Sequence, residues 1–292
     1  MTNSTTNDVL LSVVIPTYNR NDLLEKCLIN LAPGKQTLDP SLYEVIVTDD
    51  SKEKKAESFV KDNFPWAKCM EGPHKGPASN RNNGAKHTTG AWLVFIDDDC
   101  LAVETLLTDY YEAIKKNKEI KAFEGSIFPL TPLIGDLVEC PVNTEGGCFW
   151  SANICIQKDL FSKIGGFDET YLIAAQEDQD IYLRIQDFTS VLFIISAKVF
   201  HPIRKVSLLK SIKGINKKCL NWLYFAQKNK LKLGFSSKKE IIIFNYKFHI
   251  ITFIRVVKGF KPKQSVIELI MIFYGIPFMI INLYSNKRFF KL

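Results

Sequence analysis

Residues 92–100 read WLVFIDDDC, a run of five apolar residues followed directly by three aspartates. The apolar part, Trp92–Ile96, is typical of a buried β-strand. Three carboxylates at the end of a strand repel one another and are costly to desolvate, so a cation or several donors must compensate them. Asp97 and Asp99 would point the same way from a locally extended backbone. Oxygen ligands in that arrangement suit Mg²⁺ or Mn²⁺, and the alternative is a solvated acidic turn.

Short apolar runs and helical patterns alternate on both sides of this stretch. The expected strands are Ser12–Pro16, Tyr43–Thr48, Trp92–Ile96, Cys148–Ile156 and Val191–Ile195. The expected helices are Asp22–Leu31, Lys54–Asn63, Pro77–His87, Glu104–Lys116, Asp159–Ile164 and Gln176–Gln186. The order of the first elements predicts an α/β fold, with a mostly parallel central sheet flanked by helices.

Polar residues follow each of the first three strands. They are Thr17–Arg20, Asp49–Ser51 and Asp97–Asp99. Ligands of such sheets bind beyond the carboxyl ends of the strands, so these segments are expected to form one composite site.

Several other classes of protein are disfavoured. No GxGxxG follows the first strand and no GxxxxGK[ST] occurs, which argues against dinucleotide cofactors and P-loop chemistry. The seven cysteines include no CxxC pair, which favours reduced, buried thiols in the cytoplasm over zinc ligands. The polar segment Met1–Asn7 lacks the apolar core of a signal peptide.

The last third of the chain has a different character. Residues 198–292 contain 20 Lys/Arg and two acids, whereas residues 1–197 contain 18 Lys/Arg and 29 acids. Ser207–Lys232 is basic and amphipathic, and Ile241–Val257 and Ser265–Tyr284 are strongly apolar. Gly275 and Pro277 are expected to interrupt the last segment, which predicts interfacial or re-entrant helices at an anionic membrane surface. The alternative is a soluble helical subdomain, and the long aliphatic runs disfavour a nucleic-acid partner.

A series of motifs extends from residue 13 to about His201. In chain order they are Val13–Arg20 (VVIPTYNR), Val45–Ser51 (VIVTDDS), Asn80–Ala85 (NRNNGA), Phe95–Asp99 (FIDDD), Gly165–Glu169 (GGFDE) and Gln176–Asp180 (QEDQD). Together they resemble the family 2 inverting glycosyltransferases, which have the Rossmann-like GT-A fold. Lys52 departs from the pattern, since many members have glycine near that turn. The resemblance implies a catalytic domain at residues 1–205. The composition of residues 206–292 predicts a basic, apolar, helical region that is membrane-associated.

The resemblance also implies a nucleotide-diphosphate sugar donor, with a UDP-sugar favoured. The residues expected at the nucleotide are Pro16, Thr17, Tyr18, Asn19, Asp49, Asp50, Arg81, Asp97 and Asp98. Asp49 or Asp50 would accept a hydrogen bond from the base, although both could instead cap the following helix. Arg81 offers a fork of donors to a base carbonyl or a phosphate, and a surface ion pair is its alternative.

The metal ligands implied by the resemblance are Asp99, Asp97 and His201, which would hold Mn²⁺ or Mg²⁺. Asp178 would be the general base that takes the proton of the acceptor hydroxyl, with Glu177 in support. The alternative interpretation of Glu177 and Asp178 is a charged helix N-terminus. The residues expected at the donor sugar and the acceptor are Trp150, Asn153, Gly166 and Asp168. Trp150 and Asn153 could equally be core residues.

The predicted function is therefore metal-dependent, inverting transfer of a sugar to a glycan or a lipid-linked acceptor at the inner face of the cell membrane. Two other functions fit part of the pattern. A sugar nucleotidyltransferase would carry a Gly-rich, basic loop after the first strand, where this chain has Thr17–Arg20. A non-catalytic binding module of the same fold would lack the metal carboxylate or the base, and Asp99 and Asp178 are both present.

Overall fold

The structure is a computed structural model that describes residues 11–53, 55–171 and 173–285. The polar segment Met1–Asn7 and the expected first residue of the second helix, Lys54, lie outside the described residues.

A central sheet of eight strands runs in the order β3-β2-β1-β4-β8-β6-β9-β5. The strands are β1 (Leu11–Thr17), β2 (Tyr43–Asp49), β3 (Lys68–Glu71), β4 (Trp92–Ile96), β5 (Leu101–Ala102), β6 (Ala122–Pro129), β8 (Asn153–Gln157) and β9 (Val191–His201). The pairs β1–β2, β1–β4, β2–β3 and β6–β9 are parallel, and β4–β8, β6–β8 and β5–β9 are antiparallel. The predicted α/β fold with a largely parallel sheet is confirmed.

Strand register brings three polar strand ends together. Thr17 at the end of β1 pairs with Asp49 at the end of β2, and Val14 pairs with Phe95 near the end of β4. The acidic residues Asp97–Asp99 therefore leave the sheet beside the segment that follows β1.

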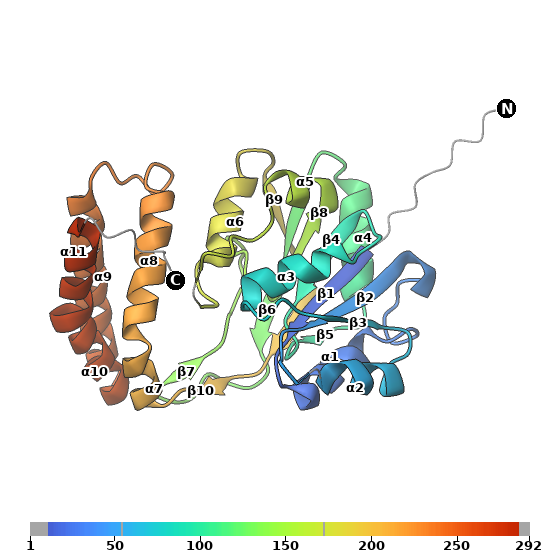
Figure 1. Cartoon of the computed structure of the whole chain (residues 1–292), viewed down its shortest axis with the longest axis horizontal. Helices are drawn as coiled ribbons and strands as arrows, with labels where there is room; N and C mark the ends of the chain where they lie inside the picture. Colours follow the sequence, from blue (N-terminus) through green and yellow to red (C-terminus); the bar gives the residue numbers. More distant parts are fainter. Residues whose placement is uncertain (1–10, 54, 172, 286–292) are drawn as a thin grey trace.

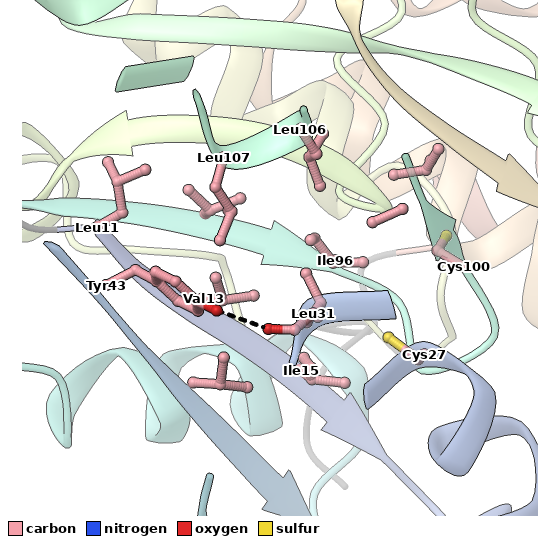
Figure 2. Packing of buried hydrophobic residues seen from close by; sticks show 14 of the residues in the cluster. Leu11, Val13, Ile15, Cys27, Leu31, Tyr43, Ile96, Cys100, Leu106 and Leu107 are labelled. Carbon is pink, nitrogen blue, oxygen red and sulfur yellow. Dashed lines mark hydrogen bonds between the residues drawn. The ribbon is translucent and has the colours of Figure 1, made fainter. Parts of the chain in front are cut away.

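Helices cover both faces of the sheet (Figure 1). They are α1 (Asn21–Leu31), α2 (Lys55–Asn63), α3 (Pro77–Lys86), α4 (Leu106–Lys116), α5 (Lys158–Lys163) and α6 (Glu177–Ile185). α1 buries Leu24, Cys27, Leu28 and Leu31, a helical spacing that places them on one face against the sheet. Figure 2 shows this packing, in which the Tyr43 hydroxyl donates to the Leu31 carbonyl at 3.0 Å.

α3 packs on the sheet in a different way, because it has no wide apolar face. Its Gly84 allows close approach to β1, since a Cβ there would lie 2.5 Å from Val14 Cγ1. Its buried residues include Asn80, Arg81 and Asn82. The helix thus carries polar side chains beneath the site.

Two expected strands have different bounds in the structure. β8 begins at Asn153, five residues later than expected, because Gly146, Gly147 and Phe149 have positive φ angles of 86°, 84° and 48°. That backbone forms a loop in which the Gly147 and Phe149 amides donate to the Glu124 carboxylate. β9 continues to His201, six residues beyond the expected end.

Five C-terminal helices follow a small two-stranded sheet of β7 (Val138–Glu139) and β10 (Arg204–Lys205). They are α7 (Leu208–Lys213), α8 (Ile215–Lys228), α9 (Lys238–Lys258), α10 (Pro262–Ile270) and α11 (Ile276–Tyr284). Figure 1 shows them as a group beside the sheet, with α8 on the side that faces α6.

The expected interruption at Gly275 and Pro277 is wrong. A π-helical segment, Met271–Gly275, joins α10 to α11, so that Pro262–Tyr284 forms one helix of 23 residues. Local widening of this kind accommodates a proline inside a helix. The helix spans roughly 34 Å at 1.5 Å per residue. It has a mean hydropathy of 2.1 in its most apolar window, of which 28% is buried, and it is long and apolar enough to cross a membrane. Buried helices of soluble proteins can have the same length and composition.

Candidate active site

The middle aspartate of the triplet points into the protein. Asp98 is fully buried, accepts a hydrogen bond from Thr17 Oγ1 at 2.7 Å and lies 2.6 Å from an Arg20 guanidinium nitrogen. Burial raises its pKa to about 7, although Arg20 and Thr17 act in the opposite direction. The structure therefore does not place Asp98 where a nucleotide would reach it, and its contacts fix the end of β1 to the end of β4.

The last aspartate lies in a group of possible metal ligands. Ligand atoms of Asp99, Cys100 and His201 lie within 4.8 Å of one another, and all three residues are buried. His201 Nε2 lies 3.2 Å from Asp99 Oδ1, and Arg204 forms an ion pair with the other carboxylate oxygen. Burial alone would raise the pKa of Asp99, but His201 and Arg204 outweigh it and hold the pKa well below its usual range.

Arg81 connects the acidic end of β4 to α6. One terminal nitrogen donates to Asp97 at 2.8 Å, and the other donates to Glu177 at 3.2 Å. The guanidinium is buried and lies 5.6 Å from the centre of the Phe167 ring. A buried arginine with two carboxylates has little freedom to move, so α3 sets the distance between β4 and α6.

The expected base and its neighbour lie in the first turn of α6. Gln176 precedes the helix with a left-handed φ of 69°, and Glu177 and Asp178 are both buried. Burial and the charge of Asp178 raise the pKa of Glu177 to about 7. Burial also raises the pKa of Asp178 to about 6, against an opposing effect of Arg81. A carboxylate with such a pKa can accept a proton near neutral pH.

We expect the rate of any reaction that uses this pair as a base to rise with pH through a midpoint between about 6 and 7. The midpoint belongs to the coupled pair rather than to one residue. Both pKa values exceed those of the unfolded chain, about 4. The two carboxyls therefore favour folding below about pH 4 and oppose it as the pH rises through their folded pKa values. A pH–rate profile measures the midpoint, and a flat profile between pH 5 and pH 8 would contradict the assignment.

These features agree with comparisons to known proteins. Residues 12–123 match the description "Glycosyl transferase family 2". The chain contains a family 2 glycosyltransferase domain. An uncharacterized glycosyltransferase of Haemophilus influenzae is 27% identical over 190 residues, which cover 60% of this chain and 62% of the relative. A GalNAc(5)-diNAcBac-PP-undecaprenol beta-1,3-glucosyltransferase of Campylobacter jejuni is 36% identical over 94 residues, 30% of this chain and 29% of the relative.

Solved structures support the same fold. S. aureus TarS 1-349 has a TM-score of 0.55 at 16% identity, over 74% of this chain and 64% of that chain. The same protein in complex with UDP has a TM-score of 0.52 at 18% identity, over 73% and 65%. The chain spans less than two thirds of the length of the curated relatives named above.

Asp49 and Asp50 of the family 2 domain both have structural contacts. Asp49 accepts hydrogen bonds from the Ser51 amide and hydroxyl and from the Ala56 amide in the first turn of α2. Asp50 accepts from the amides of His74 and Gly76, at 2.5 and 2.8 Å. Asp49 thus caps the N-terminus of α2, which is the alternative to a contact with the base. Asp50 fixes the loop before α3.

The segment after β1 is the most open part of the expected nucleotide site. Pro16 and Thr17 are buried, whereas Tyr18 is 57% exposed and Asn19 has a φ of 53°. An exposed aromatic ring there is available to stack on a base.

Asn153 is not placed as a ligand of the sugar. Its carboxamide donates to the carbonyls of Ser126 and Ala197, at 3.0 and 2.8 Å, and accepts from the Tyr110 hydroxyl at 2.8 Å. These contacts use its donors and its acceptor inside the core. Trp150, its predicted companion, is half-buried against the core.

We expect Asn153→Leu to lower the free energy of unfolding by about 3 kcal/mol, because it leaves buried polar groups without partners. Tyr110→Phe should lower it by about 1 kcal/mol, since it removes one hydrogen bond. Denaturant unfolding measures both values. A folded Asn153→Leu variant with unchanged stability and weakened donor binding would restore the sugar-binding interpretation.

Gly166 and Asp168 of the Gly165–Glu169 motif both have structural contacts. Gly166 has a φ of 67°, and a Cβ there would lie 2.6 Å from Asn82 Oδ1. Asp168 accepts from Tyr224 at 2.7 Å and from Lys228 at 2.6 Å, both in α8. The carboxylate of Asp168 therefore contacts the C-terminal helices, where an acceptor hydroxyl was expected.

The sequence motifs indicate no role for Cys100 or Arg204, and they include Arg20 only as part of the polar segment Thr17–Arg20. Arg20 ends the VVIPTYNR motif and Arg204 lies three residues after His201, so their positions were the available signal. Arg20 pairs with Asp98 and Asp99, and Arg204 pairs with Asp99. These arginines, with Arg81, supply the positive charge that three adjacent carboxylates require.

Proposed function

We propose that the chain transfers a sugar from a nucleotide-diphosphate donor, a UDP-sugar by preference, to a hydroxyl group of a glycan or lipid-linked acceptor, with inversion at the anomeric carbon. The observation that carries this proposal is the bridge from Asp97 through Arg81 to Glu177. It holds the acidic end of β4 and the first turn of α6 close to each other, which supports a single site between them.

The donor side of the site is formed by the ends of β1, β2 and β4. Tyr18 is available to stack on the base, and the partly exposed Asp97 is available to a ribose hydroxyl. Asp50 and Asp49 remain proposed base contacts, since a carboxylate oxygen can accept a second hydrogen bond. The complex of TarS with UDP supports a uridine nucleotide.

A divalent cation, Mn²⁺ or Mg²⁺, fits the residues at the end of β4. Asp99 Oδ1 is buried and accepts no hydrogen bond within the described residues, and it faces His201 Nε2. An oxygen and an imidazole nitrogen so placed are suitable ligands, and Asp97 is a further proposed ligand. A bound cation would neutralise charge on the diphosphate as it leaves.

The acceptor side is formed by α6. In the proposed step, Asp178 takes the proton of the acceptor hydroxyl while its oxygen bonds to the anomeric carbon. The bond from that carbon to the diphosphate breaks, and the nucleoside diphosphate leaves with the electron pair. Arg81 holds the neighbouring Glu177, and with it the first turn of α6, in place. Trp150 and Gly166 stay proposed contacts of the sugar or the acceptor.

We further propose that residues 1–205 form the catalytic domain and that residues 206–292 attach it to the inner, cytoplasmic face of an anionic membrane. The described C-terminal helices expose large apolar side chains. They include Phe244, Phe248, Ile251, Ile254, Val257, Phe273, Tyr274, Ile281 and Tyr284. Basic residues lie at the turn between α9 and α10, namely Lys258, Lys261 and Lys263. Apolar faces with basic flanks bind anionic lipid surfaces, and the Campylobacter relative is named for a lipid-linked acceptor.

A flotation assay with phosphatidylglycerol vesicles tests this attachment. Phe273→Asp/Ile281→Asp should weaken binding by about 100-fold, because burying each large apolar side chain contributes about 1.5–3 kcal/mol. The control is Phe188→Asp/Ile195→Asp, which changes two exposed apolar residues outside the C-terminal helices. Equal binding of the two variants, or no binding of the wild-type chain, would sink the membrane proposal.

The donor is best identified by a thermal-shift panel of nucleotide sugars with and without Mn²⁺, because a ligand of the folded state raises Tm. We expect a UDP-sugar to raise Tm only with the metal, and the same mixture with an acceptor to release UDP. A response to a nucleoside triphosphate with a sugar phosphate would instead indicate a nucleotidyltransferase. A shift without any turnover would indicate a binding module.

A further inference from the structure

We infer that Lys228 of α8 is a positioning residue for the base-bearing helix α6, an inference that rests on the proposed function. Its ammonium group lies 2.6 Å from Asp168 and 2.9 Å from Asp180. Asp168 lies in the chain segment that leads into α6, and Asp180 lies two residues after Asp178 within α6. One cation from the C-terminal helices therefore joins the helix that carries the proposed base to the segment that precedes it.

Asp180 is a buried charge that depends on donors from other parts of the chain. Its side chain is fully buried and contacts Arg184 Nε at 2.8 Å and Asn229 Nδ2 at 3.1 Å, in addition to Lys228. Loss of one donor leaves the charge of a buried carboxylate partly uncompensated, which strongly destabilises its buried position. The position of α6 is thus sensitive to a residue outside the family 2 motifs.

The segment before α6 is held by the same helix. The buried Asn221 of α8 contacts the carbonyl oxygens of Ile173 and Ala175, at 3.2 and 3.0 Å. Ala175 directly precedes Gln176, whose left-handed backbone begins α6. α8 therefore fixes the backbone on which the direction of the Glu177 and Asp178 side chains depends.

The opposite face of α8 packs on the apolar C-terminal helices. Cys219, Leu223 and Ala226 belong to a buried cluster with residues of α9 and α11, among them Ile241 and Met279. α8 consequently lies between the proposed membrane-binding helices and the proposed base (Figure 1). The acceptor side of the site is incomplete without the C-terminal helices.

The test compares Lys228→Met with Lys232→Met in the full-length chain. Lys232 is a matched control, because it contacts the other end of α6 through the Leu183 carbonyl and Asp187. We expect Lys228→Met to speed amide hydrogen exchange in residues 168–182 and to lower kcat by about 10- to 100-fold, with the affinity for UDP and Mn²⁺ unchanged. Lys232→Met should leave exchange in 168–182 and kcat near the wild-type values. Lys228→Arg should restore most of kcat, since it returns the cation.

Three results would overturn the inference: unchanged exchange in residues 168–182, an equal effect of Lys232→Met, or faster exchange with unchanged kcat. If Lys228→Met does not fold, Lys228→Gln takes its place, because it keeps a donor without the charge. If the wild-type chain transfers no sugar from any donor, the proposed function fails. The exchange comparison then still decides whether Lys228 orders the segment before α6.

Discussion

Asp178→Asn will remove sugar transfer while leaving the binding of UDP and Mn²⁺ intact. The substitution keeps the shape of the side chain but removes its ability to take a proton near neutral pH. General-base assistance of this kind contributes typically about 10²–10⁴-fold, and we expect kcat to fall by that factor. Release of UDP in the presence of acceptor measures kcat, and calorimetric titration measures the affinity for UDP.

The control for Asp178→Asn is Asp62→Asn, which changes an exposed aspartate of α2 in the same way. Its kcat should equal that of the wild-type chain. Near-normal turnover of Asp178→Asn would show that another residue is the general base. Glu177 would be the next candidate, because its pKa is raised and it forms an ion pair with Arg81.

Asp99→Ala should abolish the metal dependence of UDP binding. The carboxylate lies at the centre of the candidate metal group and is the partner of both His201 and Arg204. Loss of the charge that the metal would bind removes stabilisation of the leaving diphosphate, and we expect kcat to fall by about 10²–10³-fold. Titration of UDP with Mn²⁺ and with a chelator measures the effect.

A change in folding must be separated from a change in metal binding for Asp99→Ala. Asp99→Asn keeps the size of the side chain and one acceptor oxygen, which can still accept from Arg204. It should disturb the fold less than Asp99→Ala, yet it should bind Mn²⁺ weakly. Undiminished Mn²⁺-dependent affinity for UDP in both variants would remove Asp99 from the metal site.

The sheet and the meeting of its strand ends could be predicted from the sequence. Trp92–Ile96 and Ser12–Pro16 are apolar runs of strand length, and the polar residues that follow them can only lie at the carboxyl edge of a parallel sheet. The pairing of β1 with β2 and β4 confirms this arrangement. Local pattern was sufficient here because each strand is buried on both faces.

The partners of individual polar side chains could not be predicted, because they depend on contacts between distant residues. Asn153 follows an aromatic pair, as a sugar-binding residue would, yet its partners are 27 and 44 residues away in β6 and β9. Asp168 belongs to a family motif, and its partners lie in α8, which the motifs do not reach. Charge pattern alone does not reveal which carboxylate faces the solvent.

The most direct test of the central claim is anomalous diffraction at the manganese edge from crystals grown with UDP and Mn²⁺. We predict one manganese peak within coordination distance of the Asp99 carboxylate and the UDP diphosphate, with the Asp178 carboxylate facing the same site from α6. A nucleotide bound away from the ends of β1 and β4, or an Asp178 side chain directed away from the diphosphate, would contradict the account.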